Sequence, residues 1–474
     1  MKYGDKEFSV ELGSGLIAAE LHSNTVALPK KSALEHINEA LDNPIGSPTL
    51  EEMLKPGQTV CIVVPDSTRL WQSPNVYVPA VVARLNKCGI RDADIRILTA
   101  TGSHRPMSRE EHIAIVSEDI YNRIGVVDHK CRESADMVKA GVTSHGTEVW
   151  FNRHAMECDH IILTGGVVYH FLAGYGGGPK YLLPGIASYE TIQRHHNLAL
   201  NKGFGSGTNA AVRSANMEQS NIFHADLEEA ALLAKPSFLL NVVVDDSYNI
   251  IKAVAGDMVL AHREACALVD AIDGVNVAER TPLVIASAGG APKDINFYQT
   301  IKTLANALAV VSEGGTIIIL SACTEGFGSP DTERQIRDFD AMEAREKDLR
   351  ENFSIGSYVG FLFAESAEKH NLIMVCSMAA ADFAKTRIHT VTTLDEALAL
   401  AKKLNGGKEM RATLLPHGAN TLPKFTGLAD GGRPTFASPA RYTAPPRAGG
   451  VAAIGFVMRG GHERYRLIHD LKPL

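Results

Sequence analysis

The chain has 474 residues, of which 45% are hydrophobic and 21% are charged, and its formal net charge at pH 7 is −7. This length exceeds one ordinary hydrophobic core, so two domains are expected, while the negative charge and the few aromatic residues exclude a typical nucleic-acid-binding surface. No apolar run of membrane-spanning or signal-peptide length is evident, so the sequence predicts a cytoplasmic protein with no membrane or nucleic-acid partner.

The seven cysteines are scattered along the chain without a C-x-x-C pair. In a cytoplasmic protein this pattern favours reduced thiols over disulfides or a zinc site. A bound metal would therefore need histidine or a cofactor for most of its ligands.

Two predicted strands in the first half end in polar groups. Residues 59–65 form an apolar run that ends in Asp66 and Arg69, and residues 94–98 predict a strand that leads to His104. Open α/β sheets bind ligands at the carboxyl ends of their strands, and the planar fork of arginine suits a carboxylate or phosphate. Each residue also has a purely structural alternative: Asp66 could be a helix N-cap, Arg69 a surface residue and His104 an ordinary exposed loop residue.

A third predicted strand, at residues 161–163, runs into a glycine-rich loop that contains His170 and Lys180, and the adjacent His195 and His196 follow. Glycines let the backbone approach a phosphate, and a lysine without bulky neighbours can be a phosphate clamp or a covalent anchor. The polar groups at the three strand ends are expected to converge on one crevice if the strands are neighbours in a parallel sheet.

The second half repeats the pattern of strand and glycine-bearing loop. Strands are predicted at 283–288, 316–320 and 372–376, with helices between them, and Lys293 follows the first of these strands. Lys293 either reaches across an interdomain cleft or is a solvated loop lysine. The sequence therefore predicts an α/β protein of two domains, each a mostly parallel sheet flanked by helices, with the active site in the cleft between them.

Weaker patterns of hydrophobic residues predict further helices and strands. They are a strand at 8–12, helices at 32–37, 79–87 and 258–272, and a strand at 238–244. From these we expect an N-terminal cofactor-binding and catalytic domain at 1–255, a linker helix at 256–280, a C-terminal α/β domain closing over the site at 281–425, and a Pro-, Gly- and Arg-rich extension at 426–474. Within the extension, residues 451–457 could form an edge strand.

Taken in order, the motifs resemble the nickel-pincer lactate racemase family over roughly residues 1–425. The matching pieces are Asp66-Ser67-Thr68-Arg69, Thr101-Gly102-Ser103-His104, Tyr169-His170 followed by Lys180, Glu190-Thr191-Ile192 leading to His196, and Gly289-Gly290-Ala291-Pro292-Lys293-Asp294. So many motifs in the same order make chance agreement improbable. The extension beyond residue 425 has no counterpart in the resemblance.

The resemblance implies a racemase or epimerase, an isomerase that inverts C2 of a 2-hydroxy acid by hydride abstraction and return. In such enzymes the loop lysine, here Lys180, is joined through a thioamide to pyridinium-3,5-bisthiocarboxylic acid mononucleotide, the nickel-pincer nucleotide. Two sulfurs and one carbon of this cofactor hold nickel, and His196 completes a square-planar set that suits nickel(II). The implied partners are a small 2-hydroxy acid substrate and the enzymes that synthesise the cofactor.

The resemblance also assigns roles to individual residues. His104 and His170 would act as acid and base on opposite sides of the substrate, one for each enantiomer. Arg69 would bind the substrate carboxylate with Lys293 as a helper, and Asp66 would contact the cofactor ribose or orient a partner. The remaining cofactor contacts are expected from Thr68 and, for the phosphate, from Gly176, Gly177 and Gly178.

Two other functions compete with this one. A pyridoxal-phosphate enzyme also holds its cofactor by a lysine near a glycine loop, although no aspartate partner for the pyridinium nitrogen is evident. A non-catalytic nickel- or nucleotide-binding protein would use His170 and His196 for storage. Adjacent helix residues point about 100° apart, so only one of His195 and His196 can face the site, and the spacing from His170 favours His196.

The substrate and the oligomeric state stay open. Lactate, malate, longer or aromatic 2-hydroxy acids and sugar acids such as gluconate share the reacting fragment. Candidate residues for the substrate pocket are Trp71, Tyr77, Phe297, Tyr298 and Tyr358.

Overall fold

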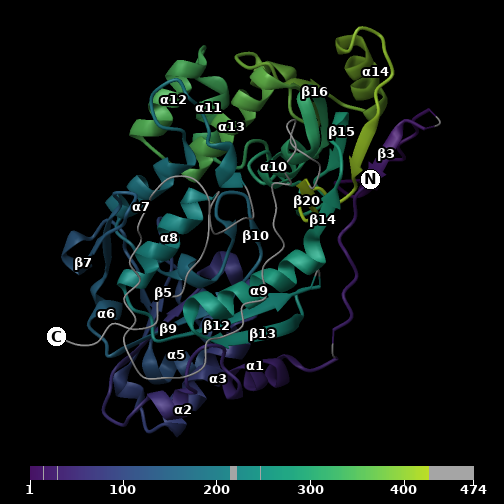
Figure 1. The fold of residues 1–474 in the computed structure, drawn as a ribbon. Coiled ribbons are helices and arrows are strands. Elements are labelled where there is room, and N and C mark those ends of the chain that lie inside the picture. Colours follow the sequence, from purple (N-terminus) through teal and green to yellow (C-terminus); the bar gives the residue numbers. More distant parts are fainter. Residues whose placement is uncertain (14, 29, 214–220, 246, 426–474) are drawn as a thin grey trace, which may run out of the picture. The chain divides into compact units, whose positions relative to one another are not determined.

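The computed structural model describes residues 1–13, 15–28, 30–213, 221–245 and 247–425. Two six-stranded sheets organise this part of the chain (Figure 1). No helix within these ranges has both the length and the apolar content needed to cross a membrane. The strand predicted at 451–457 lies outside the described residues.

The first sheet has the strand order β13-β12-β9-β4-β5-β6. All neighbouring strands are parallel except the antiparallel pair β12 and β13. The three strands with polar ends, β9, β4 and β5, are direct neighbours, so their carboxyl ends meet at one edge of the sheet. The strands are β4 (Val60–Val64), β5 (Ile95–Thr99), β6 (Val127–Asp128), β9 (His160–Gly166), β12 (Phe238–Val244) and β13 (Ile250–Gly256).

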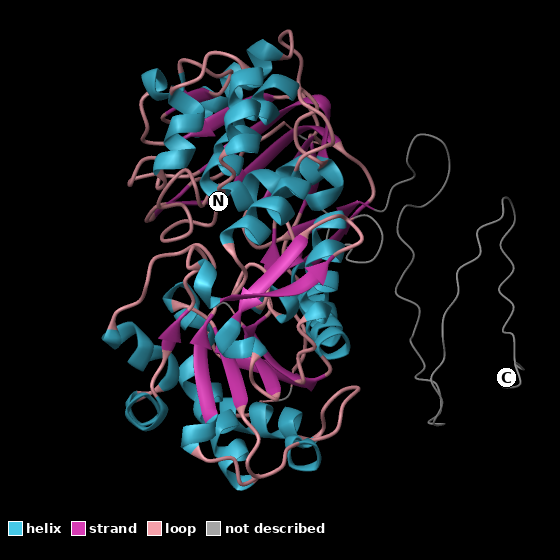
Figure 2. Cartoon of the chain, turned by 90° about the vertical axis from the view of Figure 1, so that its left-hand side faces the viewer, coloured by secondary structure: helices cyan, strands magenta, loops and turns pink. Residues whose placement is uncertain are grey.

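Helices cover both faces of this sheet (Figure 2), and strand β4 shows why. All five residues of β4 are buried, and alternate side chains point to opposite faces. Val60, Ile62 and Val64 pack in one cluster with α1 and α3, whereas Cys61 and Val63 pack in another with α8 and α9. The helices of this region are α1 (Ala33–Asp42), α2 (Leu50–Met53), α3 (Pro74–Lys87), α4 (Arg109–Val116), α5 (Glu118–Ile124), α6 (Arg153–Met156), α7 (Tyr189–His196), α8 (Ile222–Leu233) and α9 (Met258–Asp273).

The second sheet is parallel throughout and has the order β18-β17-β16-β15-β19-β3. Helices α10 and α13 pack on one face and α14 on the other. The prediction of an α/β fold with two mostly parallel sheets flanked by helices is therefore confirmed. The elements are β3 (Ile17–Glu20), β15 (Thr281–Ser287), α10 (Ile301–Val310), β16 (Val311–Leu320), α11 (Pro330–Arg337), α12 (Met342–Glu351), α13 (Ile355–Lys369), β17 (Asn371–Val375), β18 (His389–Val391), α14 (Leu394–Leu404) and β19 (Ala412–Leu415).

The N-terminal segment differs from its prediction. Residues 8–12 form no strand; Phe8, Val10 and Leu12 instead pack as extended chain against the core beneath α14, which explains their alternation. The strand β3 follows and pairs with β19, so the second sheet takes its edge from a segment assigned to the first domain. The proposed domain boundaries stay a prediction.

Short strands complete the described chain. β1 (Lys2–Tyr3) pairs with β2 (Lys6–Glu7), β7 (Met137–Val142) with β8 (Glu148–Asn152), β10 (Tyr169–His170) with β11 (Gly174–Tyr175), and β14 (Gly274–Val277) with β20 (Leu422–Phe425). The predicted linker segment thus contains helix α9 and strand β14.

Candidate active site

Asp66 organises the end of strand β4. It caps the short helix at Ser67–Gln72, where its Oδ1 accepts hydrogen bonds from the backbone N–H and the hydroxyl of Thr68. Its Oδ2 accepts a hydrogen bond from Nδ1 of His104, which follows β5. Burial alone would raise the pKa of the Asp66 carboxyl, but the bonds from His104 and Thr68 hold this pKa below its usual value. Asp66 is thus both a helix cap and the partner of His104.

The bond to Asp66 determines which nitrogen of His104 carries the proton. A carboxylate only accepts, so Nδ1 of His104 is protonated and Nε2 keeps its lone pair. The Asp66 side chain is 6% exposed and that of His104 is 55% exposed. A buried carboxylate therefore orients an accessible imidazole whose basic nitrogen points away from it.

Arg69 lies beside this pair and is partly buried. Its Nη1 donates to the backbone oxygen of Thr68 at 3.3 Å and to the Thr68 hydroxyl at 3.0 Å. No carboxylate among the described residues forms an ion pair with Arg69. Its guanidinium is therefore held in place with donors left for an anionic ligand.

The end of β9 is shaped around Tyr181, the residue after Lys180. The Tyr181 hydroxyl accepts the N–H of Gly166 at 3.1 Å and donates to Oε1 of Gln72 at 3.1 Å. A Cβ at Gly165 would lie 1.8 Å from the Tyr181 hydroxyl oxygen. Glycine at 165 is thus required because Tyr181 crosses the strand end, and this contact fixes the turn that carries Lys180.

The following glycines are packed against strand β12 and helix α9. Gly178 donates its N–H to Oδ1 of Asn241 at 2.8 Å, Gly176 donates its own to Val168 O at 2.7 Å, and His262 donates to the Gly176 carbonyl at 2.8 Å. Two of the N–H groups expected to bind a phosphate are therefore already bonded within the protein. The phosphate role of Gly176, Gly177 and Gly178 stays a prediction, and packing is a sufficient reason for these glycines.

Gly178→Ala tests this packing. Gly178 has φ +50°, and a Cβ there would lie 2.6 Å from the His262 ring. Strain and overpacking together are expected to lower the free energy of unfolding by about 2–4 kcal/mol. Gly57→Ala is the control, because Gly57 has φ +87° with nothing within 4 Å and should lose only about 1 kcal/mol. Urea unfolding measures both, and equal losses would show that the His262 contact does not matter.

Lys180 is partly buried, and its side-chain amine makes no hydrogen bond or ion pair with any described residue. Burial, and then the charge of Arg69, lower the pKa of Lys180 well below its usual value. Burial thus favours the neutral amine, which is the nucleophilic form of lysine. The loop of His104 is joined to the Lys180 turn, because Gly102 N–H donates to Gly185 O at 2.9 Å.

His170 lies on the β10–β11 hairpin, and its ring stacks on Phe171 at a centroid distance of 5.1 Å. Nδ1 of His170 accepts the backbone N–H groups of Leu172 and Ala173, both at 3.2 Å. Burial lowers the pKa of His170 well below its usual value, followed by the charges of Lys180, Arg69, His196 and Lys302. Burial and these neighbouring nitrogen groups thus favour the neutral imidazole form of His170.

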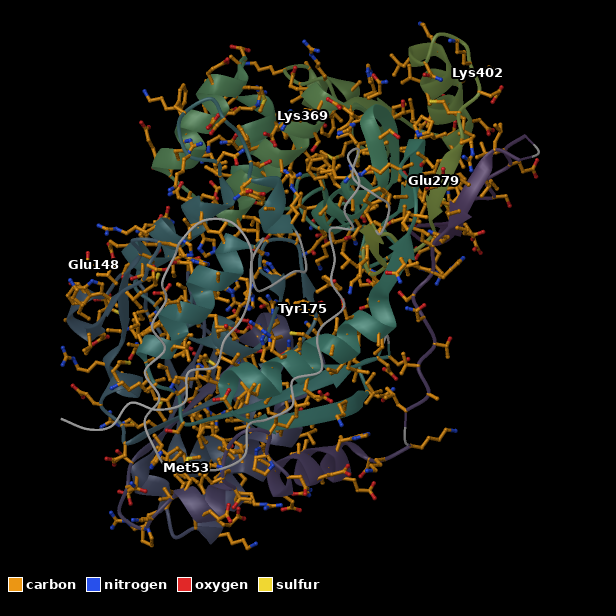
Figure 3. All side chains as sticks on the ribbon, viewed as in Figure 1. Met53, Glu148, Tyr175, Glu279, Lys369 and Lys402 are labelled. Atoms are coloured by element: carbon orange, nitrogen blue, oxygen red, sulfur yellow. The ribbon has the colours of Figure 1, made fainter. Side chains whose placement is uncertain are left out.

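Helix α9 anchors this hairpin. The hydroxyls of Tyr169 and Tyr175 donate to Oδ1 of Asp270 at 3.1 and 2.7 Å, and Asp270 also pairs with Lys424 of β20. Tyr175 is 3% exposed and lies in the interior, between helices and strands, whereas Glu148 and Lys402 lie at the periphery (Figure 3). The position of His170 thus depends on two buried tyrosines and one carboxylate.

The structure separates the adjacent histidines of helix α7. His195 donates from Nδ1 to Asp226 at 2.8 Å, and both side chains are fully buried. His196 donates from Nδ1 to Ile192 O at 2.8 Å, and its Nε2 makes no hydrogen bond to a described residue. Burial, then His195 and Lys180, lower the pKa of His196 well below its usual value. Nε2 of both rings thus lacks a hydrogen-bond partner among the described residues, and the two rings differ in that His195 is bound to a buried carboxylate and His196 to a backbone carbonyl.

Residues after β15 contribute further groups. Burial, and then the charges of Arg69 and Lys293, lower the pKa of Lys302. Tyr298 is partly buried, and the charge of Arg69 opposes the rise that burial causes in its pKa. Both sheets thus supply groups to one electrostatic neighbourhood, in which the charge of Arg69, with Lys293 and Lys302 nearby, favours an anionic ligand.

Comparison with known proteins identifies this arrangement. The family model described as "Lactate racemase N-terminal domain" matches residues 3–207, and the model "Lactate racemase C-terminal domain" matches residues 277–422. The chain is 33% identical to a lactate racemase of Lactiplantibacillus plantarum over 432 residues, which is 90% of this chain and 99% of the relative. The chain belongs to the lactate racemase family. A lactate racemase of Thermoanaerobacterium thermosaccharolyticum is 30% identical over 426 residues, 89% of this chain and 97% of that protein.

Solved structures agree with this membership. The lactate racemase apoprotein from Thermoanaerobacterium thermosaccharolyticum has a TM-score of 0.78 at 29% identity, covering 89% of this chain and 99% of that one. A protein from Thermotoga maritima has a TM-score of 0.58 at 17% identity, covering 84% and 100%, and supports the fold alone. The chain is accordingly a racemase or epimerase of the lactate racemase family.

One group of this lactate racemase family member, Lys302, escaped the sequence-based prediction. Lys302 lies on the first turn of α10. The sequence pattern in this region indicated only the loop lysine Lys293, and Lys302 was therefore not included. Of the proposed pocket residues, Tyr77, Phe297 and Tyr358 are fully buried core side chains. Trp71 is partly buried with its ring centroid 6.2 Å from that of Tyr248, and Tyr298 lies near Arg69. No three His, Cys, Asp or Glu side chains gather as metal ligands in the part of the chain that the structure describes.

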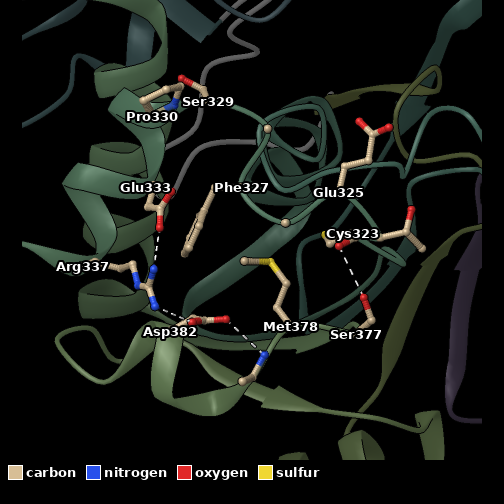
Figure 4. Close-up of a pocket in the computed structure, with 14 residues that line it drawn as sticks. Cys323, Glu325, Phe327, Ser329, Pro330, Glu333, Arg337, Ser377, Met378 and Asp382 are labelled. Atoms are coloured by element: carbon tan, nitrogen blue, oxygen red, sulfur yellow. Dashed lines mark hydrogen bonds and ion pairs between the residues drawn. The ribbon is translucent and has the colours of Figure 1, made fainter.

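The family member also has a cavity of about 520 Å³ that is lined by none of the predicted site residues. The loop after β16, helix α11 and the segment after β17 form it (Figure 4). Arg337 there already pairs with Glu333 at 2.5 Å and Asp382 at 2.9 Å. The candidate site residues therefore gather at the strand ends of the first sheet, beside residues that follow β15, and not in this cavity.

Proposed function

We propose that this protein inverts C2 of a 2-hydroxy acid by hydride abstraction and return, with a nickel-pincer nucleotide attached to Lys180. The observation that carries the proposal is the side-chain amine of Lys180, which makes no hydrogen bond or ion pair with a described residue, has a pKa lowered by burial, and shares its surroundings with His170, His196 and Arg69. A tethered hydride acceptor and an acid–base pair are the two parts that such chemistry requires.

The groups present fit the proposed cofactor. Lys180 supplies an amine suited to thioamide formation, and His196 supplies Nε2 as a metal ligand because the Ile192 carbonyl fixes the proton on Nδ1. A single protein ligand is sufficient, since two sulfurs and one carbon of pyridinium-3,5-bisthiocarboxylic acid mononucleotide provide the other positions around nickel. When bound, this group supplies a hydride acceptor.

The remaining residues would bind and activate the substrate. Arg69 is the proposed carboxylate ligand, because its planar fork is oriented by Thr68 and is paired with no described carboxylate. Lys293 and Lys302 add positive charge beside it. Nε2 of His104 would take the hydroxyl proton, and the resulting imidazolium would be stabilised by Asp66.

Intact-protein mass measurement tests the attachment, using protein produced together with the cofactor-synthesis enzymes. We expect an adduct of several hundred daltons on Lys180 that contains nickel and sulfur. An imine adduct reducible by borohydride would instead indicate a pyridoxal-phosphate enzyme. Nickel bound without any adduct or isomerisation would indicate a metal carrier.

The reaction is tested with a panel of enantiopure 2-hydroxy acids: lactate, malate, longer aliphatic and aromatic acids, and gluconate. Chiral chromatography should detect inversion of at least one of them by the loaded protein. A deuterium label at C2 should be largely retained, because the hydride returns to the carbon that lost it. Rapid loss of the label to solvent would support a carbanion route and contradict the proposal.

A further inference from the structure

Two glycines at the end of strand β9 make room for side chains from two other segments. At Gly165, a Cβ would lie 1.8 Å from the hydroxyl oxygen of Tyr181. At Gly166, a Cβ would lie 2.8 Å from Cδ of Gln72. Tyr181 is 7% exposed and Gln72 is 1% exposed. The two side chains therefore pack in the interior, directly against the backbone of β9.

Hydrogen bonds join these two side chains to each other and to the strand. The Tyr181 hydroxyl accepts the N–H of Gly166 and donates to Oε1 of Gln72, each at 3.1 Å. Nε2 of Gln72 donates in turn to the Gly166 carbonyl through a longer bond, at 3.5 Å. Neither side chain can turn away without leaving buried polar groups unpaired, which is costly.

The two side chains belong to the two segments that carry the proposed site. Gln72 ends the short helix that contains Arg69, and Tyr181 ends the turn that contains Lys180. These segments follow the neighbouring strands β4 and β9. The charge of Arg69 lowers the pKa of Lys180 and opposes the rise that burial causes in the pKa of Tyr181, so the segments lie close together. The bond between Tyr181 and Gln72 therefore connects the helix of Arg69 to the turn of Lys180.

We infer that Tyr181 and Gln72 are positioning residues, whose hydrogen bond fixes the Lys180 turn against the helix of Arg69. The inference rests on the proposed function, in which Lys180 holds the cofactor and Arg69 binds the substrate carboxylate. The bond then sets the position of the tether relative to a substrate held by Arg69. Reaction rates depend steeply on such placement, and a misplacement of about 1 Å can cost roughly 10²-fold.

Tyr181→Phe tests the inference, because it removes only the hydroxyl. It should lower kcat by about 10- to 100-fold and change KM by about threefold or less, since Arg69 still binds the carboxylate. Tyr77→Phe is the matched control. Tyr77 is a fully buried core residue of α3 whose hydroxyl has no hydrogen-bond partner in the described part of the chain, so kcat should change by less than about twofold.

Intact mass and thermal unfolding check that both variants carry the adduct and are folded. A purely structural role of Tyr181 would lower the melting temperature and leave kcat of the loaded, folded variant unchanged. An unchanged kcat in Tyr181→Phe, or a rise in KM alone, would therefore overturn the inference. Equal losses of kcat in Tyr181→Phe and Tyr77→Phe would overturn it as well.

The bond can also be measured without turnover, by a double-mutant cycle of urea unfolding on the full-length protein. Gln72→Leu removes the acceptor of the Tyr181 hydroxyl. The loss of stability in the double variant Tyr181→Phe, Gln72→Leu should be smaller than the sum of the two single losses, because both changes remove the same bond. Additive losses would overturn the inference. If no 2-hydroxy acid is inverted, the proposed function fails, while the cycle still decides whether the two segments are joined by this bond.

Discussion

Replacing Lys180 with alanine is expected to abolish both cofactor attachment and isomerisation. Lys180 is the only lysine in the turn that Tyr181 fixes, at Gly178–Tyr181, and burial lowers the pKa of its amine, so no other lysine of this turn can take over the tether. The rate should fall by roughly 10⁶-fold or more, to the uncatalysed level. Intact mass of protein produced with the cofactor-synthesis enzymes should show the unmodified chain.

Lys302→Ala is the matched control for the tether. Lys302 also has a lowered pKa, but it lies on helix α10 and contributes charge to the substrate region. It should keep the adduct on Lys180 and raise KM for the 2-hydroxy acid. An adduct that persists in Lys180→Ala, or one that is lost equally in both variants, would contradict attachment at position 180.

Strands were predictable from the sequence where both faces of a strand are buried, because such a strand is a continuous run of apolar residues. Strands β4, β5 and β9 were found for this reason, and their pairing as neighbours makes the polar strand ends converge. Strand β3 was missed, because the four residues Ile17–Glu20 carry only a weak pattern and their partner β19 lies near the other end of the described chain. Long-range pairing of this kind leaves no local signal.

Residue types at the site were predictable, but their partners were not. His104 and Asp66 were both identified by their positions after strands, yet only the structure joins them by a hydrogen bond. The glycine loop suggested a phosphate site, whereas much of its glycine content allows close contact with His262 and Asn241. The proton position on His170 depends on where the following N–H groups point, which sequence patterns do not encode.

Asp66→Asn is expected to lower the rate of isomerisation by about 10²- to 10⁴-fold while leaving the adduct on Lys180 in place. An asparagine amide can donate to Nδ1 of His104, which would move the imidazole proton to Nε2 and remove the basic lone pair. It would also remove the charge that stabilises the imidazolium. The expected signature is a loss in kcat from both enantiomers, with the variant still folded by thermal unfolding.

Asp128→Asn provides the control for the loss of a buried aspartate next to a histidine. Asp128 is the last residue of the edge strand β6 and contacts His112 at 2.8 Å, and neither residue is among those proposed to touch substrate or cofactor. This variant should lose stability but change kcat by less than about tenfold, since no proton transfer depends on His112. Comparable kcat losses in Asp66→Asn and Asp128→Asn would mean that Asp66 supports the fold and does not orient a base. A selective loss in Asp66→Asn therefore connects the buried carboxylate to proton transfer by His104.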